Sequence, residues 1–238
     1  MNFSGFRRVP LRAGQILTAD AMDALVSFPD ESVDLIVTDP PYGIDYQSNR
    51  RKVKDKFAKL ESDNLTEMKI MASSFFYEAF RILKPGSHAY VFTRWDVYPM
   101  FLEVAQSKGF KAKNCLVWVK DNHGSGDLYG AYAPRHEFCL FLLKPGDLNR
   151  VLRGKRSADV VFCPKIHSSK LLHPTQKPLR LLTPMIEKSS EPGEIVLDPF
   201  CGSGAVCKAA KLLRRRFIGV EIDRSIAATA KENLTNLE

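Results

Sequence analysis

The chain has 238 residues, enough for one large domain or for one domain with an embedded lobe. Hydrophobic residues make up 45% of the chain and aromatic residues 10%, a globular composition that excludes a disordered tail and a fibre. The formal net charge of +8 favours a polyanionic partner without proving one.

Strand-like and helix-like segments alternate along the chain. The predicted strands cover residues 32–38, 88–93, 115–119, 137–143, 194–197 and 217–220. The predicted helices cover residues 64–83, 95–108, 179–190, 204–213 and 224–236. The first helix stops before the breaker Lys84-Pro85-Gly86, and the second is closed by Gly109. This alternation predicts a single α/β domain over residues 1–238, with a mainly parallel central sheet flanked by helices.

Two long stretches do not fit the alternation. Residues 43–63 are polar and basic, and between Arg50 and Lys59 six basic residues accompany a single acid, Asp55. Residues 121–170 mix glycines, basic residues and short apolar runs. Segments of this length without regular structure are usually functional or disordered.

The cysteines and histidines indicate neither a disulfide framework nor a metal site. The five cysteines are scattered, and none belongs to a Cys-x-x-Cys pair. His123, His136 and His167 lack metal-ligand spacing. No uncharged apolar run approaches the roughly 18 residues of a membrane span, and we expect no signal peptide. A reducing cytoplasm therefore fits best.

Residues 194–204 form a predicted strand, a turn of small residues and the start of a helix. Small residues let the backbone approach a ligand, and a helix N-terminus offers free N–H groups. Glu221 stands 23 residues after Asp198, at the end of the next predicted strand, and an acid at that offset suits a ribose diol. Because the spacing is not Gly-x-Gly-x-x-Gly, the turn and the acid indicate an adenosine-type ligand rather than an ordinary dinucleotide.

Asp39-Pro40-Pro41-Tyr42 stands at the carboxyl end of the first predicted strand, where open α/β sheets bind ligands. The prolines fix φ and donate no N–H, so they form a stiff turn whose carbonyls remain available as acceptors. A carboxylate, a carbonyl and a ring suit a flat substrate that bears an amino group. The alternative is a strand terminator with a capping Asp and a packing Tyr, which Pro-Pro alone would favour.

Asp39-Pro40-Pro41-Tyr42 also resembles the catalytic tetrapeptide of amino-methylating DNA methyltransferases that use S-adenosylmethionine. Residues 198–204 are similar to their cofactor motif, and residues 173–178 to the segment that precedes it. The catalytic motif comes 159 residues before the cofactor motif, which is the order of the β group. The likeness runs from about Asp20 to Asn233. It implies a Rossmann-like methyltransferase fold, with a small inserted target-recognition region at 121–170.

The resemblance assigns roles to individual residues. Asp39 and the Pro40 carbonyl would accept hydrogen bonds from the target amino group, next to Pro41, and Tyr42 would stack on the base. Glu221 would hold the ribose hydroxyls of the cofactor. The expected cofactor-binding residues are Asp20, Ala21, His173, Lys177, Asp198, Pro199, Phe200, Gly202, Ser203, Gly204, Glu221 and Ile222. Of these, Asp20 would meet the adenine amino group, and His173 and Lys177 the methionine end.

The resemblance also implies double-stranded DNA as a partner, with the target base extruded from the stack. The DNA-binding candidates are Arg50, Arg51, Lys52 and Lys54 in the basic loop and Arg135, Arg153 and Arg156 in the recognition region. We expect the loop over 43–63 to be mobile without DNA and to close on phosphates. The alternative is a solvated charge run.

An Asp at the head of the tetrapeptide resembles adenine N6 enzymes more than cytosine N4 enzymes, in which Ser is commoner. The expected reaction is therefore methylation of adenine N6 in DNA. Cytosine N4 methylation, RNA methylation and a catalytically silent DNA-binding relative remain alternatives, although the intact tetrapeptide argues against the last. Members of this group often pair, so we expect a homodimer. Nothing in the sequence shows whether a restriction endonuclease accompanies the protein.

Overall fold

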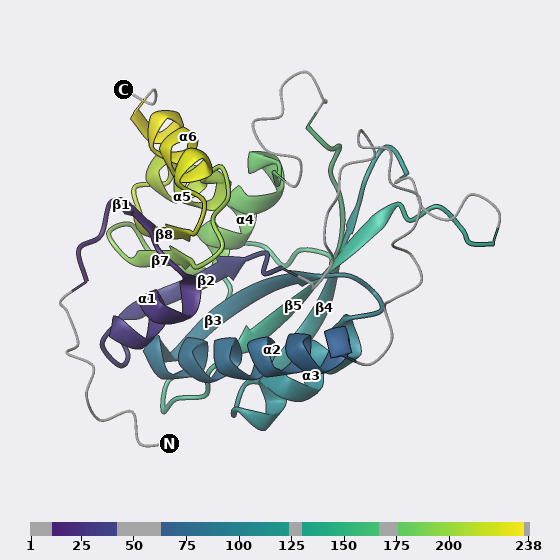
Figure 1. Ribbon diagram of the computed structural model, residues 1–238, viewed down its shortest axis with the longest axis horizontal. Helices are drawn as coiled ribbons and strands as arrows, with labels where there is room; N and C mark the ends of the chain where they lie inside the picture. The colour runs from purple at the N-terminus through teal and green to yellow at the C-terminus, as the bar shows by residue number, and fades with distance from the viewer. Residues whose placement is uncertain (1–10, 42–62, 124–129, 167–175, 236–238) are drawn as a thin grey trace.

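The computed structural model describes residues 11–41, 63–123, 130–166 and 176–235 (Figure 1). One sheet joins its strands in the order β1-β8-β7-β2-β3-β5-β4-β6. The strands are β1 (Gln15–Thr18), β2 (Val33–Thr38), β3 (Leu83–Thr93), β4 (Lys111–Val119), β5 (His136–Leu143), β6 (Val160–Phe162), β7 (Ile195–Asp198) and β8 (Arg216–Glu221). The helices are α1 (Ala21–Ser27), α2 (Asp63–Ile82), α3 (Tyr98–Ser107), α4 (Leu179–Ser189), α5 (Ala205–Leu212) and α6 (Arg224–Thr235).

The sheet is mainly parallel, as the sequence predicts. Among the described strands only β5 runs against its neighbours, pairing antiparallel with both β3 and β4. Because β5 is reversed, its amino end lies at the edge of the sheet where the other strands have their carboxyl ends. Strand β5 also lies inside the expected recognition region. Residues 121–170 are therefore not wholly an insertion, since they supply an internal strand of the sheet.

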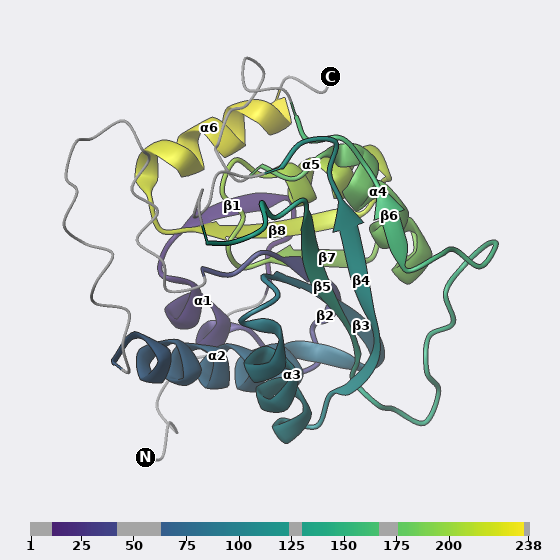
Figure 2. The same cartoon turned by 90° about the vertical axis from the view of Figure 1, so that its right-hand side faces the viewer.

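Helices cover both faces of the sheet. Helices α1, α2 and α3 lie on one face, and α4, α5 and α6 lie on the other (Figures 1 and 2). Strand β2 shows why, because every one of its residues is buried. Leu35 and Val37 pack in the cluster of buried residues that α4, α5 and α6 share, whereas Ile36 packs with residues of α1, α2 and α3. Continuous burial is typical of a parallel strand covered on both faces.

The observed boundaries differ from the predicted ones in a few places. Helix α2 ends before Lys84-Pro85-Gly86, as predicted, but β3 begins directly at Leu83 rather than at residue 88 and contains this segment, with an irregularity in its pairing with β2 between Val33 and Leu35. Helix α3 starts at Tyr98 rather than at residue 95. The N–H of Tyr98 donates to the Arg94 carbonyl, and a turn occupies the residues between them. The sequence analysis missed β1, α1 and β6, which have four, seven and three residues.

The two predicted motifs meet in the middle of the sheet. Strands β2 and β7 pair in parallel, with Leu35 opposite Val196 and Ile36 opposite Leu197. From β2 the chain continues to β3 on one side, and from β7 it continues to β8 on the other. Their following helices, α2 and α5, lie on opposite faces (Figure 2). Such a reversal of strand order opens a crevice at the carboxyl ends of the two strands.

None of the helices in the described ranges combines the length and the hydrophobicity that crossing a lipid bilayer requires.

Candidate active site

The ends of β2 and β7 are fastened to each other. The hydroxyl of Thr38 donates to Oδ1 of Asp198 at 2.7 Å, and the N–H of Phe200 donates to the same oxygen at 3.2 Å. Asp198 is buried, and burial raises its pKa to about 7, although the hydrogen bonds from Thr38 and Phe200 oppose that rise. Asp198 therefore joins the end of β2, the expected catalytic strand, to the turn over residues 198–204, the expected cofactor turn.

Asp39 directly follows β2, and its side chain is held by Lys177. The ammonium of Lys177 pairs with Oδ2 of Asp39 and lies 3.1 Å from Oε2 of Glu137. Only 8% of the Lys177 side chain is exposed. Its ammonium lies 5.1 Å from the ring centroid of Phe92 and 5.9 Å from that of Trp118. Lys177 was expected at the methionine end of the cofactor, but in this structure its amine points to two carboxylates.

Glu137 extends this contact into a chain of alternating charges. Its Oε1 pairs with the ammonium of Lys120, which lies 5.0 Å from the centroid of Trp118. Burial acts to raise the pKa of Glu137, but Lys177 and Lys120 outweigh it and the pKa is lowered. Burial likewise acts to lower the pKa of Lys177, but Asp39 and Glu137 outweigh it and the pKa is raised. Glu137 and Lys177 are therefore held in their charged forms.

The cofactor turn is positioned by the carboxylate of Glu221. The N–H of Gly202 donates to its Oε2 at 3.1 Å, and the N–H of Asp223 donates to its Oε1 at 2.9 Å. The N–H of Cys201 donates to the Val220 carbonyl at 2.9 Å. Each carboxylate oxygen has two lone pairs, so Glu221 retains capacity to accept from a ligand hydroxyl. Ile222, the next residue, is an apolar side chain with 69% of its surface exposed.

Helix α6 fixes the other side of the turn. Gly204 has φ of +80°, and a Cβ there would lie 3.2 Å from Cβ of Ala230. The side-chain amide of Asn233 donates to the Ser203 carbonyl at 3.0 Å. Pro199 is buried with Ser203 and Gly204, whereas Phe200 is half-buried against Phe75 at 5.7 Å between ring centroids.

Asp20 lies at the same edge of the sheet. The N–H of Ala19 donates to the Glu221 carbonyl at 3.1 Å, which brings the carboxyl ends of β1 and β8 together. Oδ1 of Asp20 accepts from the N–H groups of Met22 and Asp23, so this side chain caps α1. Ala21 is buried behind it.

The structure thus brings most predicted site residues to one edge. Those gathered there are Asp20, Ala21, Asp39, Pro40, Pro41, Lys177, Asp198, Pro199, Phe200, Gly202, Ser203, Gly204, Glu221 and Ile222. Arg135 also lies there, since its Nε donates to the Lys120 carbonyl at 2.7 Å. Six predicted residues lie outside the described ranges: Tyr42, Arg50, Arg51, Lys52, Lys54 and His173.

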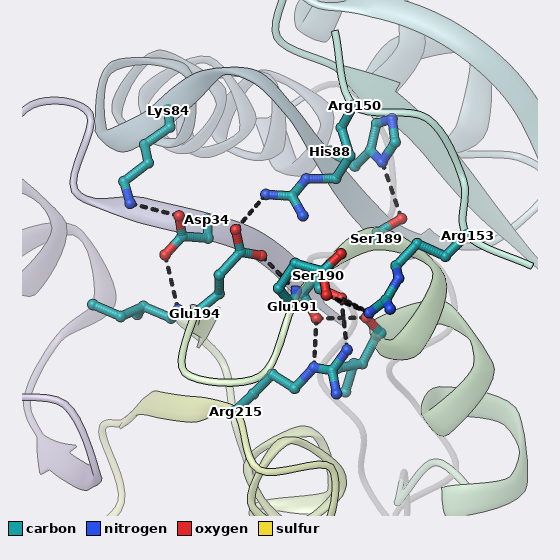
Figure 3. A network of polar contacts seen from close by, with 12 residues as sticks. Asp34, Lys84, His88, Arg150, Arg153, Ser189, Ser190, Glu191, Glu194 and Arg215 are labelled. Carbon is teal, nitrogen blue, oxygen red and sulfur yellow. Dashed lines mark hydrogen bonds and ion pairs between the residues drawn. The ribbon is translucent and has the colours of Figure 1, made fainter.

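Arg153 and Arg156 are placed elsewhere. Arg153 pairs with Glu191 at 2.5 Å, before the amino end of β7 (Figure 3). Arg156 follows Lys155, whose carbonyl accepts from Lys188 in the last turn of α4. Both segments lie where the parallel strands of the sheet have their amino ends, which we call the amino edge. Asp39 lies at the opposite, carboxyl edge, where these strands end. Their position therefore does not support grouping them with the catalytic residues.

Sequence reasoning missed four residues of the site, namely Thr38, Trp118, Lys120 and Glu137. Two of them carry a recognisable signal, because Lys120 and Glu137 are charged residues that directly flank or begin apolar strand segments. Such a position is unusual unless the charge is paired. The pairing itself could not be predicted, since Lys177 lies 40 residues beyond Glu137.

The residues present fit S-adenosylmethionine. Gly202 and Gly204 keep the turn free of side chains, and Glu221 offers acceptors for a ribose diol. Exposed Ile222 beside Glu221 offers an apolar surface of the kind that a purine ring covers. Within the described ranges no three His, Cys, Asp or Glu side chains gather in a way that could hold a metal ion.

Comparisons with known proteins agree with this geometry. The family model of N6/N4 DNA methylases, described as a DNA methylase, matches residues 33–232. The type II methyltransferase M.HpaI of Haemophilus parainfluenzae is 31% identical, over 92% of this chain and 74% of that protein. The type II methyltransferase M.BglII of Bacillus subtilis is 29% identical, over 93% and 69%. The crystal structure of the M1.HpyAVI–SAM complex has a TM-score of 0.71 and 26% identity, covering 92% of this chain and 98% of that one.

The match spans the catalytic strand, the cofactor turn and every strand from β2 to β8. It confirms the methyltransferase fold that the resemblance implies, and S-adenosylmethionine is the cofactor of this family. The chain therefore belongs to the N6/N4 DNA methylase family and is an S-adenosylmethionine-dependent DNA methyltransferase.

Proposed function

We propose that this methyltransferase methylates the exocyclic N6 of adenine in double-stranded DNA. The observation that carries the proposal is Asp39, an acid at the head of the catalytic tetrapeptide, at the carboxyl end of β2 and beside the cofactor strand β7. An Asp at this position resembles adenine enzymes more than cytosine enzymes. The specificity rests on that resemblance, whereas the placement of the acid rests on the fold.

The chemistry requires acceptors rather than a strong base. The lone pair of an exocyclic amine is delocalised into the ring, so the amine is a poor nucleophile. The carboxylate of Asp39 and the carbonyl of Pro40 would accept its N–H groups out of the ring plane and favour a pyramidal nitrogen. S-adenosylmethionine, when bound, supplies the electrophilic methyl group. The carboxylate need not remove a proton first, because the nitrogen turns acidic only as it is methylated.

The cofactor would be held by the residues around the Gly202 turn. Glu221 would accept the ribose hydroxyls, and Ile222 would cover the adenine ring, whose amino group Asp20 would meet. Pro199, Phe200 and Ser203 would line the turn on the side of Asp198. We assign His173 to the methionine end from the resemblance alone.

Access to the target atom requires base flipping. Extruding a base costs a few kcal/mol, and stacking on Tyr42 would recover roughly 1–3 kcal/mol. The basic residues Arg50, Arg51, Lys52 and Lys54 would then close on phosphates. Arg135 is exposed at the edge of the sheet that holds Asp39, which we call the reacting edge. It is the best placed of the described candidates for a DNA contact. We include a homodimer in the proposal, which sedimentation analysis would test.

Cytosine N4 is the second candidate target. Cytosine also presents an amino group next to a ring nitrogen, so the same loop can serve it. The matched family covers both N6 and N4 enzymes, so cytosine N4 stays a candidate target.

The experiment is transfer of tritiated methyl from S-adenosylmethionine to unmethylated DNA, followed by nucleoside analysis. We expect label in N6-methyladenine, and we expect Asp39→Asn to lower kcat by roughly 10²–10³-fold because a preorganised acceptor is weakened. Asp34→Asn is the matched control, since Asp34 is a buried acid at the opposite end of the same strand. Label in N4-methylcytosine would overturn the adenine assignment, and an active Asp39→Asn would overturn the role of Asp39.

A further inference from the structure

We propose that Glu137 is a positioning residue of the methyl-transfer site, which holds the ammonium of Lys177 against Asp39. The inference rests on the proposed role of Asp39 and goes beyond it. Glu137 belongs to none of the three sequence motifs, and the resemblance assigns it no role. It reaches the site only because β5 is reversed in the sheet.

Four separate elements contribute to the contact chain. Asp39 follows β2, Lys177 precedes α4, Glu137 is the second residue of β5, and Lys120 follows β4. Lys177 pairs with Oδ2 of Asp39 and lies 3.1 Å from Oε2 of Glu137, while Lys120 pairs with Oε1 of Glu137. Both oxygens of Glu137 are thus engaged by cations. This arrangement fixes where the ammonium of Lys177 sits relative to the reacting carboxylate.

Burial makes this ammonium dependent on both carboxylates. The Lys177 side chain is 8% exposed and lies beside the rings of Phe92 and Trp118, so water is a poor replacement for a lost partner. Without Glu137, the ammonium would pair with Asp39 alone and draw more strongly on its carboxylate. A more tightly paired carboxylate is a weaker acceptor for the target amino group.

The balance of charges around the reacting nitrogen also predicts slower methyl transfer without Glu137. The formal charges of the contact chain, those of Asp39, Lys177, Glu137 and Lys120, sum to zero. Replacing Glu137 by a neutral group brings this sum to +1, which opposes the positive charge that develops on the target nitrogen during methylation. Electrostatic placement of this kind is commonly the largest contribution to catalysis in an enclosed site.

The chain also predicts a change in pH dependence. The titratable groups that face Lys177 are Asp39, Asp198, Glu137, Lys120 and the thiol of Cys139. Asp39 and Glu137 hold the pKa of Lys177 above its ordinary value against the effect of burial. Removing the charge of Glu137 therefore lowers the pKa of Lys177, so the alkaline loss of kcat that deprotonation of Lys177 causes moves to lower pH.

The amino edge supplies a matched control. Glu194 pairs with Arg150 at 2.7 Å, and its side chain is 23% exposed, compared with 24% for Glu137 (Figure 3). Both are half-buried glutamates that pair with cations from other elements. Only Glu137 connects to Asp39. Glu194→Gln thus removes a similar ion pair without touching the reacting edge.

The experiment compares Glu137→Gln with Glu194→Gln in the full chain, with thermal unfolding to check that each is folded. We expect Glu137→Gln to lower kcat by roughly tenfold to a hundredfold, as for a lost charged hydrogen bond. KM for S-adenosylmethionine should change less, and the alkaline limb should move to lower pH. Glu137→Asp should recover part of the rate, and Glu194→Gln should keep kcat and the pH profile. A folded Glu137→Gln variant with the wild-type kcat and pH profile overturns the inference.

A second readout separates this inference from the proposed function. Carbon-13 NMR of the lysine Cε atoms titrates Lys177 in the protein without DNA or cofactor, with Lys177→Arg assigning the signal. We expect a lower pKa for Lys177 in Glu137→Gln than in the wild type. If the wild type transfers no methyl group to DNA, the proposed function fails, and this titration alone decides whether Glu137 holds Lys177. An unchanged pKa overturns the inference whatever the activity.

Discussion

Both edges of the sheet bury charged side chains, and the most buried charges differ in their partners. At the amino edge, which also holds ion pairs such as Glu194–Arg150, the buried charges bind backbone groups: Oδ2 of Asp34 accepts from the N–H of Ile195 at 2.9 Å, and Arg215 donates to the carbonyls of Ser190 and Leu213 (Figure 3). At the carboxyl edge, the contacts of Lys177 join side chain to side chain, between Asp39 and Glu137.

This difference indicates different purposes. A charge that binds a backbone carbonyl or N–H fixes the course of the chain, as Arg215 does for the loop between α4 and β7. A charge that binds another side chain fixes the position and the ionisation of that side chain. We therefore expect changes at the amino edge to alter mainly stability, and changes at the carboxyl edge to alter mainly the reaction.

The largest expected effect comes from exchanging Lys177 for Met. The change removes the cation between Asp39 and Glu137 and leaves Lys120 on the far side of Glu137, so it should lower the free energy of unfolding by about 3 kcal/mol. It should also lower kcat by more than roughly 10²-fold, because the charge beside the reacting carboxylate is lost. Denaturant unfolding and methyl transfer to DNA measure the two effects.

Arg215→Met is the counterpart at the amino edge. It leaves the buried Ser190 carbonyl without its donor from Arg215, which should lower the free energy of unfolding by about 2 kcal/mol. The kcat of the folded fraction should stay at the wild-type value. Loss of kcat in Arg215→Met, or its retention in Lys177→Met, would contradict the proposed difference between the edges.

The next prediction concerns His88, which should lower the free energy of unfolding in acid. Burial, together with the charges of Arg150 and Lys113, lowers the pKa of His88 to about 4. The folded chain keeps this imidazole neutral, whereas the unfolded chain protonates it near pH 6.5. The stability that the neutral imidazole contributes is therefore fully present above pH 6.5. It is lost as the pH falls through 6.5 towards 4, by about 3 kcal/mol in total.

Denaturant unfolding at several pH values measures this loss. His88→Asn keeps a polar group near Ser189, whose hydroxyl lies 3.0 Å from Nδ1 of His88. The variant should be less stable at pH 7 because it packs less well, but its stability should fall less steeply between pH 6.5 and 4. Equal slopes in the two proteins would show that His88 is not the group responsible.

The smallest effect belongs to Lys84, which pairs with Asp34 at 2.5 Å. Its side chain is 46% exposed, so the pair is screened by water, and Asp34 keeps its hydrogen bond from Ile195. Lys84→Met should lower the free energy of unfolding by about 1 kcal/mol or less, with no change in kcat. A decrease in the free energy of unfolding as large as that of Arg215→Met would mean that ion pairs between side chains also contribute strongly to stability at the amino edge.

Much of the fold was predictable because long elements carry periodic apolar residues. The helix over 63–82 and the buried strand over 33–38 follow directly from their patterns. Strand β6 was missed since three residues are too short to show a period, and β1 and α1 were missed for the same reason. Lys84-Pro85-Gly86 was predicted to end a helix, and α2 does end before it, but it also lies in the first residues of β3, near the sheet's amino edge, where a strand tolerates Pro.

The sequence by itself determined the chemistry of this protein: Asp39-Pro40-Pro41-Tyr42, the small residues over 198–204 and Glu221 are local signals, readable without knowing what lies beside them. Only the tertiary structure decided which charges meet. Thr38 bonds Asp198 across 160 residues, and Lys177 bonds Asp39 across 138. Such contacts depend on the order and direction of strands, which no local pattern encodes. The reversal of β5 places Glu137 at the reacting edge, and the strand order places Arg153 at the opposite one.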